Sequence, residues 1–344
     1  MDLRNHKNIL IKSYGHESGL LYLSLSLYKH LSDLGLNVKF IPKSKYIKKN
    51  SRYISSYLPI SSEYRHLFYP FVSGVNVDNQ IVDAINDHKA TLVVSFETLM
   101  QNLSWVSKVR KAGVKVIDVP MLEWVSPIYF KKMSYKLFDE IWAVTDYSME
   151  TFEAQGYRNV KRVGWDFVDR ELFFEEAVPS EEGIYHFYHQ GSLNPYHSSK
   201  NTNLVLRAFE RLNLDYGYAI KLTLTGKIED ENQQKIIKKH TNIHKYNEVL
   251  SRENIGNLYR KVNCVVVPSL KEGLGLSLFE ASACGCQLIT TDAPPMNSHN
   301  TTYLCKVSSF KQDGSLVPIA QLTVDSVYKQ MKKSYEDHAL CQTK

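Results

Sequence analysis

The sequence predicts an α/β protein made of two doubly wound domains in tandem. The chain has 344 residues, which is too long for one ordinary core and suits two domains. Short apolar stretches alternate with stretches of helical periodicity, a pattern typical of parallel sheets covered by helices. The alternation is interrupted at residues 164–176, where acidic, aromatic and turn-forming residues follow no clear period. We interpret this segment as the linker.

The first half opens with a strand–helix–strand unit. The apolar run 8–11 predicts a strand, and leucines at helical spacing over residues 20–34 predict a helix that ends at Gly35. Residues 38–41 predict the next strand, so the unit favours a parallel sheet. Further strands are predicted at residues 91–95, 114–117, 141–144 and 160–163.

The second half continues the alternation. Its predicted strands are residues 184–188, 220–225, 264–267, 287–290 and 303–307. Its predicted helices are residues 201–212, 228–240, 251–261 and 324–337.

These elements predict three parts of the chain. We expect an N-terminal domain over residues 1–168 and a second domain over residues 169–323. A C-terminal helix follows within residues 324–344, with a return toward the N-terminal domain as one expectation. Ligands of doubly wound sheets bind at the carboxyl ends of strands, so a cleft between the two domains is the expected site.

Composition excludes several classes of protein. Hydrophobic residues make up 43% and charged residues 23%, as in an ordinary globular chain. No apolar run reaches the roughly 18 residues of a membrane helix, and the N-terminus has no signal-peptide core. We therefore expect a cytoplasmic protein, with attachment to the inner membrane face as an alternative. The five cysteines show neither disulfide nor metal-site spacing.

A basic run with interspersed tyrosines covers residues 43–57, within a net charge of +6. A solvated loop or helix face is the ordinary interpretation. The alternatives are contact with an anionic membrane surface or with a phosphate-bearing acceptor. No nucleic-acid-binding motif accompanies the run, so nucleic acid is not expected as a partner.

The loop over residues 269–275 has the features of an anion site. It follows the run 264–268, which is apolar on both faces like a central parallel strand, and it precedes a predicted helix over 277–284. Gly273 and Gly275 let a ligand approach the backbone closely. The N–H groups at the helix start favour an anion such as pyrophosphate.

Two glutamates separated by seven residues accompany this loop. Glu272 lies beside the expected anion site, where it can accept hydrogen bonds from sugar hydroxyls. Glu280 lies about one turn into the helix and can reach a second set of hydroxyls. The alternative for Glu272 is a solvated loop carboxylate, and the alternative for Glu280 is a capping box with Ser277.

The stretch from Pro268 to Cys286 resembles the donor-site motif of nucleotide-sugar glycosyltransferases with the GT-B fold, namely two Rossmann-like domains that face a cleft. More narrowly, it resembles the retaining group one enzymes, also called family four. The resemblance implies that Glu272 contacts the donor sugar near the reacting centre and that Glu280 binds the ribose. It also implies that backbone groups hold the sugar and diphosphate, at Gly273, Leu274, Gly275 and Leu276.

Two other segments resemble the same family. His189 to Leu193, followed by Lys200, resembles its phosphate-binding segment, and Lys200 fills the role of the usual lysine. Ser192 stands where an arginine is usual, which removes one cation from the diphosphate site; Arg207 or Lys227 could replace it. Gly15 belongs to a loop that resembles the one facing the diphosphate from the first domain.

The implied activity is transfer of a sugar from a nucleoside diphosphate to an acceptor hydroxyl, with retention at the anomeric carbon. The catalytic residues would be Lys200, which stabilises the leaving diphosphate, and Glu272, which orients the sugar. No cofactor is expected, and no metal, because the chain lacks Asp-x-Asp. The acceptor stays open among glycans, lipid-linked molecules and other hydroxyl compounds. Its candidate contacts, each weighed against an ordinary solvated side chain, are His16, Glu17, Glu97 and Glu123.

Two other functions are kept as alternatives. One is a catalytically weakened sugar-nucleotide-binding subunit of the same fold, which the serine at position 192 motivates. The other is a nicotinamide-dependent oxidoreductase. The sequence disfavours it, because no G-x-G-x-x-G follows the first strand and no acidic residue ends the second.

Overall fold

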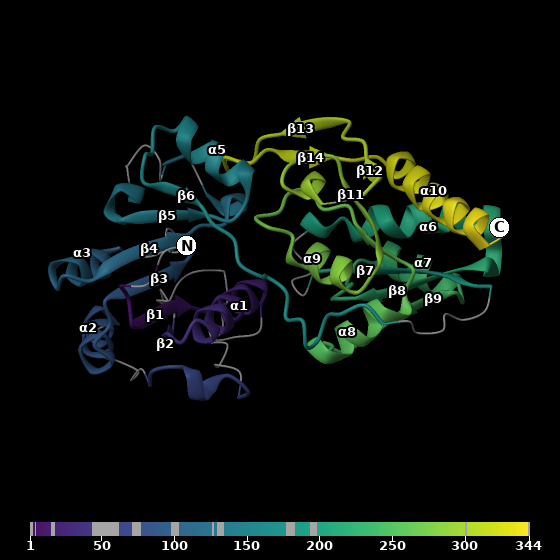
Figure 1. Ribbon diagram of the computed structural model, residues 1–344. Helices are drawn as coiled ribbons and strands as arrows, with labels where there is room; N and C mark the ends of the chain where they lie inside the picture. The colour runs from purple at the N-terminus through teal and green to yellow at the C-terminus, as the bar shows by residue number, and fades with distance from the viewer. Residues whose placement is uncertain are drawn as a thin grey trace. The chain divides into compact units, whose positions relative to one another are not determined.

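The computed structural model describes residues 3, 5–14, 18–42, 62–70, 77–97, 103–125, 127–128, 134–176, 183–192, 198–299 and 301–342. The chain divides into two compact units, Met1–Phe167 and Val168–Lys344, whose elements are labelled in Figure 1. Each unit is an α/β structure with a six-stranded sheet of parallel strands. The basic residues 43–52, together with Gly15, His16 and Glu17, lie outside the described residues.

The sheet of the first unit has the strand order β2-β1-β3-β4-β5-β6. Its strands are β1 (Asn8–Ser13), β2 (Asn37–Pro42), β3 (Leu92–Phe96), β4 (Lys115–Val119), β5 (Glu140–Ala143) and β6 (Val160–Arg162). Its helices are α1 (Gly19–Asp33), α2 (Val77–His88), α3 (Ser104–Lys111), α5 (Asp146–Ala154) and the 3-10 turns η1 (Arg65–Leu67), η3 (Leu122–Trp124) and η4 (Ser134–Leu137). Every residue of β3 is buried, as expected for a central parallel strand.

The sheet of the second unit has the order β12-β11-β10-β7-β8-β9. Its strands are β7 (Tyr185–Gln190), β8 (Ile220–Thr225), β9 (Ile243–Lys245), β10 (Cys264–Val267), β11 (Gln287–Thr291) and β12 (Tyr303–Cys305). Its helices are α6 (Thr202–Tyr216), α7 (Glu231–Lys239), α8 (Arg252–Lys261), α9 (Leu276–Ala283), α10 (Val324–Gln342) and the 3-10 turns η5 (Ser198–Lys200), η6 (Gly217–Ala219) and η7 (Met296–Ser298). A separate antiparallel hairpin pairs β13 (Ser309–Lys311) with β14 (Ile319–Gln321).

Helices cover both faces of the second sheet. Alternate residues of its central strands enter opposite cores: Phe187 and Val266 pack in one, and Tyr188 and Val265 in the other. The first core is closed by α6 and α10, which lie side by side, and the second by α8 and α9 (Figure 1). The predicted doubly wound α/β fold with two Rossmann-like domains is therefore confirmed.

Several elements differ from the predictions. The strand β9 and the hairpin β13–β14 were not predicted, because β9 has three residues and every residue of β13 is exposed. The helix α7 starts at Glu231, three residues after the predicted start, because Asp230 caps it by accepting from the Gln233 amide at 2.9 Å. The helix α10 packs on α6, β11 and β12 of its own unit. No helix in the described ranges combines the length and apolar character needed to cross a membrane.

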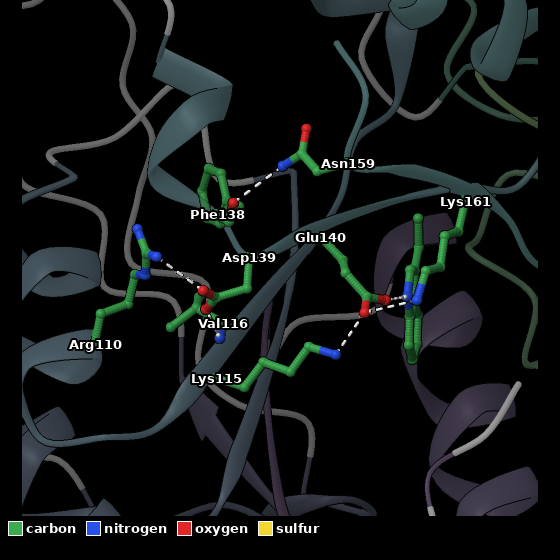
Figure 2. A network of polar contacts seen from close by, with 9 residues as sticks. Arg110, Lys115, Val116, Phe138, Asp139, Glu140, Asn159 and Lys161 are labelled. Atoms are coloured by element: carbon green, nitrogen blue, oxygen red, sulfur yellow. Dashed lines mark hydrogen bonds and ion pairs between the residues drawn. The ribbon is translucent and has the colours of Figure 1, made fainter.

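A polar network joins β4, β5 and β6 at the start of these strands (Figure 2). Oε1 of Glu140 lies 2.5 Å from Lys115 Nζ and 2.8 Å from Lys161 Nζ, and Trp142 Nε1 donates to Oε2 at 3.1 Å. Burial alone would raise the pKa of Glu140, but these hydrogen bonds lower it to about 2. The ionised carboxylate therefore stabilises the first unit.

We expect Glu140→Gln to flatten the acid dependence of stability. The folded-state pKa is below the ordinary value of 4.5, so the stabilisation is present above that value and is lost as pH falls toward about 2. After allowance for solvent screening, the loss at neutral pH is on the order of 1–2 kcal/mol. Urea unfolding between pH 7 and 3 measures it, with Glu150→Gln as an exposed control. Equal pH slopes for wild type and Glu140→Gln would contradict the assignment.

Candidate functional site

The β10–α9 loop (residues 268–275) is fixed by bonds from several elements. Three successive carbonyl oxygens accept hydrogen bonds: Pro268 from Asn201 Nδ2 at 2.9 Å, Ser269 from Thr291 Oγ1 at 2.6 Å and Leu270 from the Ala320 amide at 2.9 Å. The Leu270 amide donates to the Ser199 carbonyl at 2.8 Å. Because each of these backbone groups has a partner, the loop leaves the strand in a preset conformation.

The start of α9 depends on a glycine. Gly275 precedes the helix with φ of +78°, and a Cβ there would lie 3.2 Å from Leu278 Cδ1. The helix begins at Leu276, and no side chain caps it. The capping box considered for Ser277 and Glu280 is therefore wrong.

The two predicted catalytic residues meet. Lys200, the last residue of η5, forms an ion pair with Glu272 of the β10–α9 loop. The Lys200 side chain is 28% exposed and that of Glu272 is 11% exposed, so the pair lies at the surface of the unit. The fold thus brings a cation that follows β7 and a carboxylate that follows β10 together, in the segment that leads into α9.

Glu280 has a different environment from Glu272. It is buried, with 3% exposure, and it forms an ion pair with Arg252, the first residue of α8. Burial raises the pKa of the Glu280 carboxyl, and the charge of Arg252 acts against that shift. The sequence analysis missed Arg252, although a cation in the first turn of a helix opposes the helix dipole and signals a specific partner.

The loops after β7 and β8 touch through their backbones. A Cβ at Gly226 would lie 2.7 Å from the carbonyl carbon of Gly191, so this approach requires glycine. The Lys227 amide donates to the Ser192 carbonyl at 2.9 Å. The backbone of Lys227 therefore lies beside that of Ser192, and both Lys227 and Arg207, a residue of α6, have exposed side chains. Lys227 is thus the candidate whose backbone is bonded to Ser192, and its role at the diphosphate site stays a prediction.

His189 fixes the end of β7. Its Nδ1 lies 2.7 Å from the Val266 carbonyl and its Nε2 lies 3.0 Å from Thr202 Oγ1. Burial lowers the pKa of His189 to about 4, so the ring is neutral at physiological pH. Nδ1 must donate to the carbonyl, and Nε2 then accepts from Thr202. This bond ties the first turn of α6 to the central strands, next to Lys200.

His299 is a second residue that the sequence analysis missed. Its ring packs edge-on against Phe279 with centroids 4.5 Å apart, and a Cβ at Gly275 would lie 3.6 Å from its Nε2. Burial lowers the pKa of His299, and a bond to Leu274 and the charge of Glu272 oppose this. The ring thus borders the β10–α9 loop.

The described candidates of the first unit lie after β3 and β4. Glu97 follows β3 with φ of +50° and is 9% exposed. Burial, followed by the charge of Glu97, raises the pKa of Tyr14 to about 12, which places these two residues near each other. Glu123 lies in η3, after β4. Their role as acceptor contacts stays a prediction.

Solved structures with two Rossmann-like domains of the GT-B type share this fold. Trehalose-6-phosphate synthase OtsA aligns with a TM-score of 0.58 and 13% identity over 95% of this chain and 91% of its own. The lipopolysaccharide outer core galactosyltransferase WaaB aligns with a TM-score of 0.54 and 14% identity over 83% and 81%. A UDP-N-acetylglucosamine 2-epimerase assigned in Listeria monocytogenes aligns with a TM-score of 0.61 and 10% identity over 96% and 88%.

The second unit is defined more closely by sequence. Residues 170–309 match the family model of the glycosyl transferases group 1, so this part of the chain is a group 1 glycosyltransferase domain. The matched range contains Lys200, Glu272 and Glu280, and it confirms the resemblance predicted from the sequence. No curated protein matches the chain.

The hairpin β13–β14 supplies a further tie to the β10–α9 loop. Lys271 Nζ lies 2.6 Å from Asp313 Oδ2, and the Lys271 side chain is 9% exposed. Burial alone would raise the pKa of Asp313, but hydrogen bonds from Lys271 and Ser315 lower it to about 2. The Asp313 carboxylate is therefore ionised at neutral pH and pairs with Lys271, the residue before Glu272.

We expect Asp313→Asn to loosen the β10–α9 loop, because the substitution removes the charge that holds Lys271. Amide hydrogen exchange in peptides covering residues 268–275 should become faster, on the order of tenfold for a lost charged hydrogen bond. Asp325→Asn is the matched control, since it removes a surface ion pair with Arg211 on another helix. The same exchange rates in the Asp313 variant and in wild type would show that the hairpin does not restrain the loop.

Proposed function

We propose that this protein is a retaining glycosyltransferase that moves a sugar from a nucleoside diphosphate to an acceptor hydroxyl without a metal. The observation that carries the proposal is the pairing of Lys200 with Glu272 beside the start of α9. The family match over residues 170–309 supports the same conclusion. The fold alone does not, because the epimerase from Listeria monocytogenes shares it.

The donor would replace the internal partners of both residues. Its diphosphate would bind Lys200, the N–H groups at the start of α9 and the neighbouring Lys227. Hydroxyls of its sugar would donate to Glu272, once Lys200 has turned to the phosphate. The backbone over 273–276 would lie along the sugar and diphosphate, where Gly273 and Gly275 leave room.

The reaction would break the bond between the anomeric carbon and the diphosphate oxygen. The acceptor oxygen would form its bond on the same face, and its proton would pass to the leaving phosphate. Negative charge grows on the diphosphate in the transition state, so Lys200 and the fixed amides stabilise that state more than the ground state. Glu272 orients the sugar and forms no covalent bond in this scheme.

A catalytically weakened sugar-nucleotide-binding subunit is the second candidate, because Ser192 stands where the family has an arginine. The backbone bond between Lys227 and Ser192 supports the active enzyme, because it brings the chain segment of a second lysine next to Ser192. The two candidates differ in one measurement. A weakened subunit would bind nucleotide sugars but would neither transfer nor hydrolyse them when purified alone.

We expect Glu272→Gln to lower transfer by about 10²–10³-fold, the usual loss for one preorganised polar group at a reacting centre. A thermal-shift screen of nucleotide sugars first identifies the donor, because a bound ligand raises the unfolding temperature. Transfer is then measured with that donor and a panel of glycan and lipid acceptors. The control is Glu253→Gln, an exposed carboxylate on α8.

Circular dichroism should show an intact fold in both variants. Wild-type rates in Glu272→Gln would defeat the proposed role of the residue. Conversion of the donor to its 2-epimer, without transfer, would instead favour the epimerase reaction.

A further inference from the structure

We propose that Arg252 is a positioning residue for nucleotide binding: it holds one oxygen of the Glu280 carboxylate, so that the other accepts hydrogen bonds from the sugar hydroxyls of the nucleoside. The inference rests on the proposed function, and it adds a residue that the donor-site motif does not contain.

The two oxygens of the Glu280 carboxylate differ in their hydrogen bonding. Arg252 Nη1 donates to Oε1, and the two side chains are 15% and 4% exposed. Among the described residues, no hydrogen bond reaches Oε2 of Glu280. The bond to Arg252 restrains this buried carboxylate, and the second oxygen would be the acceptor for the ligand.

Arg252 is itself held in place. Its guanidinium stacks on the ring of Phe173, with 4.5 Å between the guanidinium carbon and the ring centroid. Phe173 is fully buried, and its ring lies 6.0 Å from that of Tyr259. A planar guanidinium on a fixed aromatic face keeps one orientation, which a lysine ammonium would not do.

Helix stability does not explain a cation at this position. Arg252 is the first residue of α8, where a positive charge opposes the helix dipole. Ser251 caps the helix instead, by accepting from the Asn254 amide at 3.2 Å. The contact with Glu280 is thus an interaction of Arg252 that the stability of α8 does not require.

The other titratable groups near Glu280 do not supply a positive charge. They are Tyr259 on α8, Tyr188 on β7 and Cys284 at the end of α9. Burial raises the pKa of all three, so they are neutral at physiological pH. Burial also raises the pKa of Glu280, against which Arg252 acts. Without Arg252, the carboxyl would retain its proton to higher pH and would lose acceptor strength.

The test compares two arginines of one helix. Arg260 also lies on α8, stacks on Phe174 at 4.2 Å and pairs with Glu176 at 3.2 Å, but it does not contact Glu280. Arg252→Met, Arg252→Lys and the control Arg260→Met are titrated calorimetrically with UDP and with GDP between pH 6 and 9. Donor KM and kcat are measured for the same proteins.

We expect Arg252→Met to weaken nucleotide binding and raise donor KM by about 10- to 100-fold at pH 7, with a smaller change in kcat. The loss should shrink as pH rises, because Glu280 then ionises without its partner. Arg252→Lys should restore part of the affinity. Arg260→Met should change binding less than threefold at every pH, and the pH dependence should be absent in Glu280→Gln.

Two results would overturn the inference. One is unchanged affinity and pH dependence in Arg252→Met. The other is an equal, pH-independent loss in Arg252→Met and Arg260→Met, which would indicate a purely structural role. If wild type binds neither UDP nor GDP and transfers no sugar, the proposed function itself is wrong, and this inference falls with it.

Discussion

Compensation of charge around two carboxylates is the constraint on which this site depends. A carboxylate taken out of water is costly unless a cation and hydrogen bonds replace its hydration. The fold solves this problem twice within one short segment, with Lys200 for Glu272 and Arg252 for Glu280. The two solutions differ in depth: the first pair is at the surface and can exchange partners, whereas the second is buried and fixed.

The parallel sheet makes both pairs possible. Chain segments that leave β7, β8 and β10 emerge at one edge, so residues far apart in sequence become neighbours there. The β10–α9 loop is tied at three successive carbonyls, and the loops after β7 and β8 are joined through glycine. The charged side chains therefore project from a rigid backbone, which is the condition for electrostatic preorganisation.

The sequence predicted the fold, and it indicated candidate site residues, for physical reasons. Strands such as β10 are apolar on both faces and are recognisable alone, and the spacing of Glu272 and Glu280 is a local pattern. Arg252 could not be found in this way, because its partner is on another helix and the contact exists only after packing. The capping box failed for a similar reason: Gly275, at a positive φ, starts the helix before Ser277 can cap it.

Under the proposed function, the ion pair between Lys200 and Glu272 would also affect which ligands bind there. An isolated anion such as inorganic phosphate could attract Lys200, but it would leave the Glu272 carboxylate without a cation or a hydrogen-bond donor. An intact sugar nucleotide would present its diphosphate to Lys200 and its hydroxyl donors to Glu272. Both side chains would then exchange their partner for a ligand group in one binding event. Under the proposed function, the pair would therefore select against ligands that match only one of its two members.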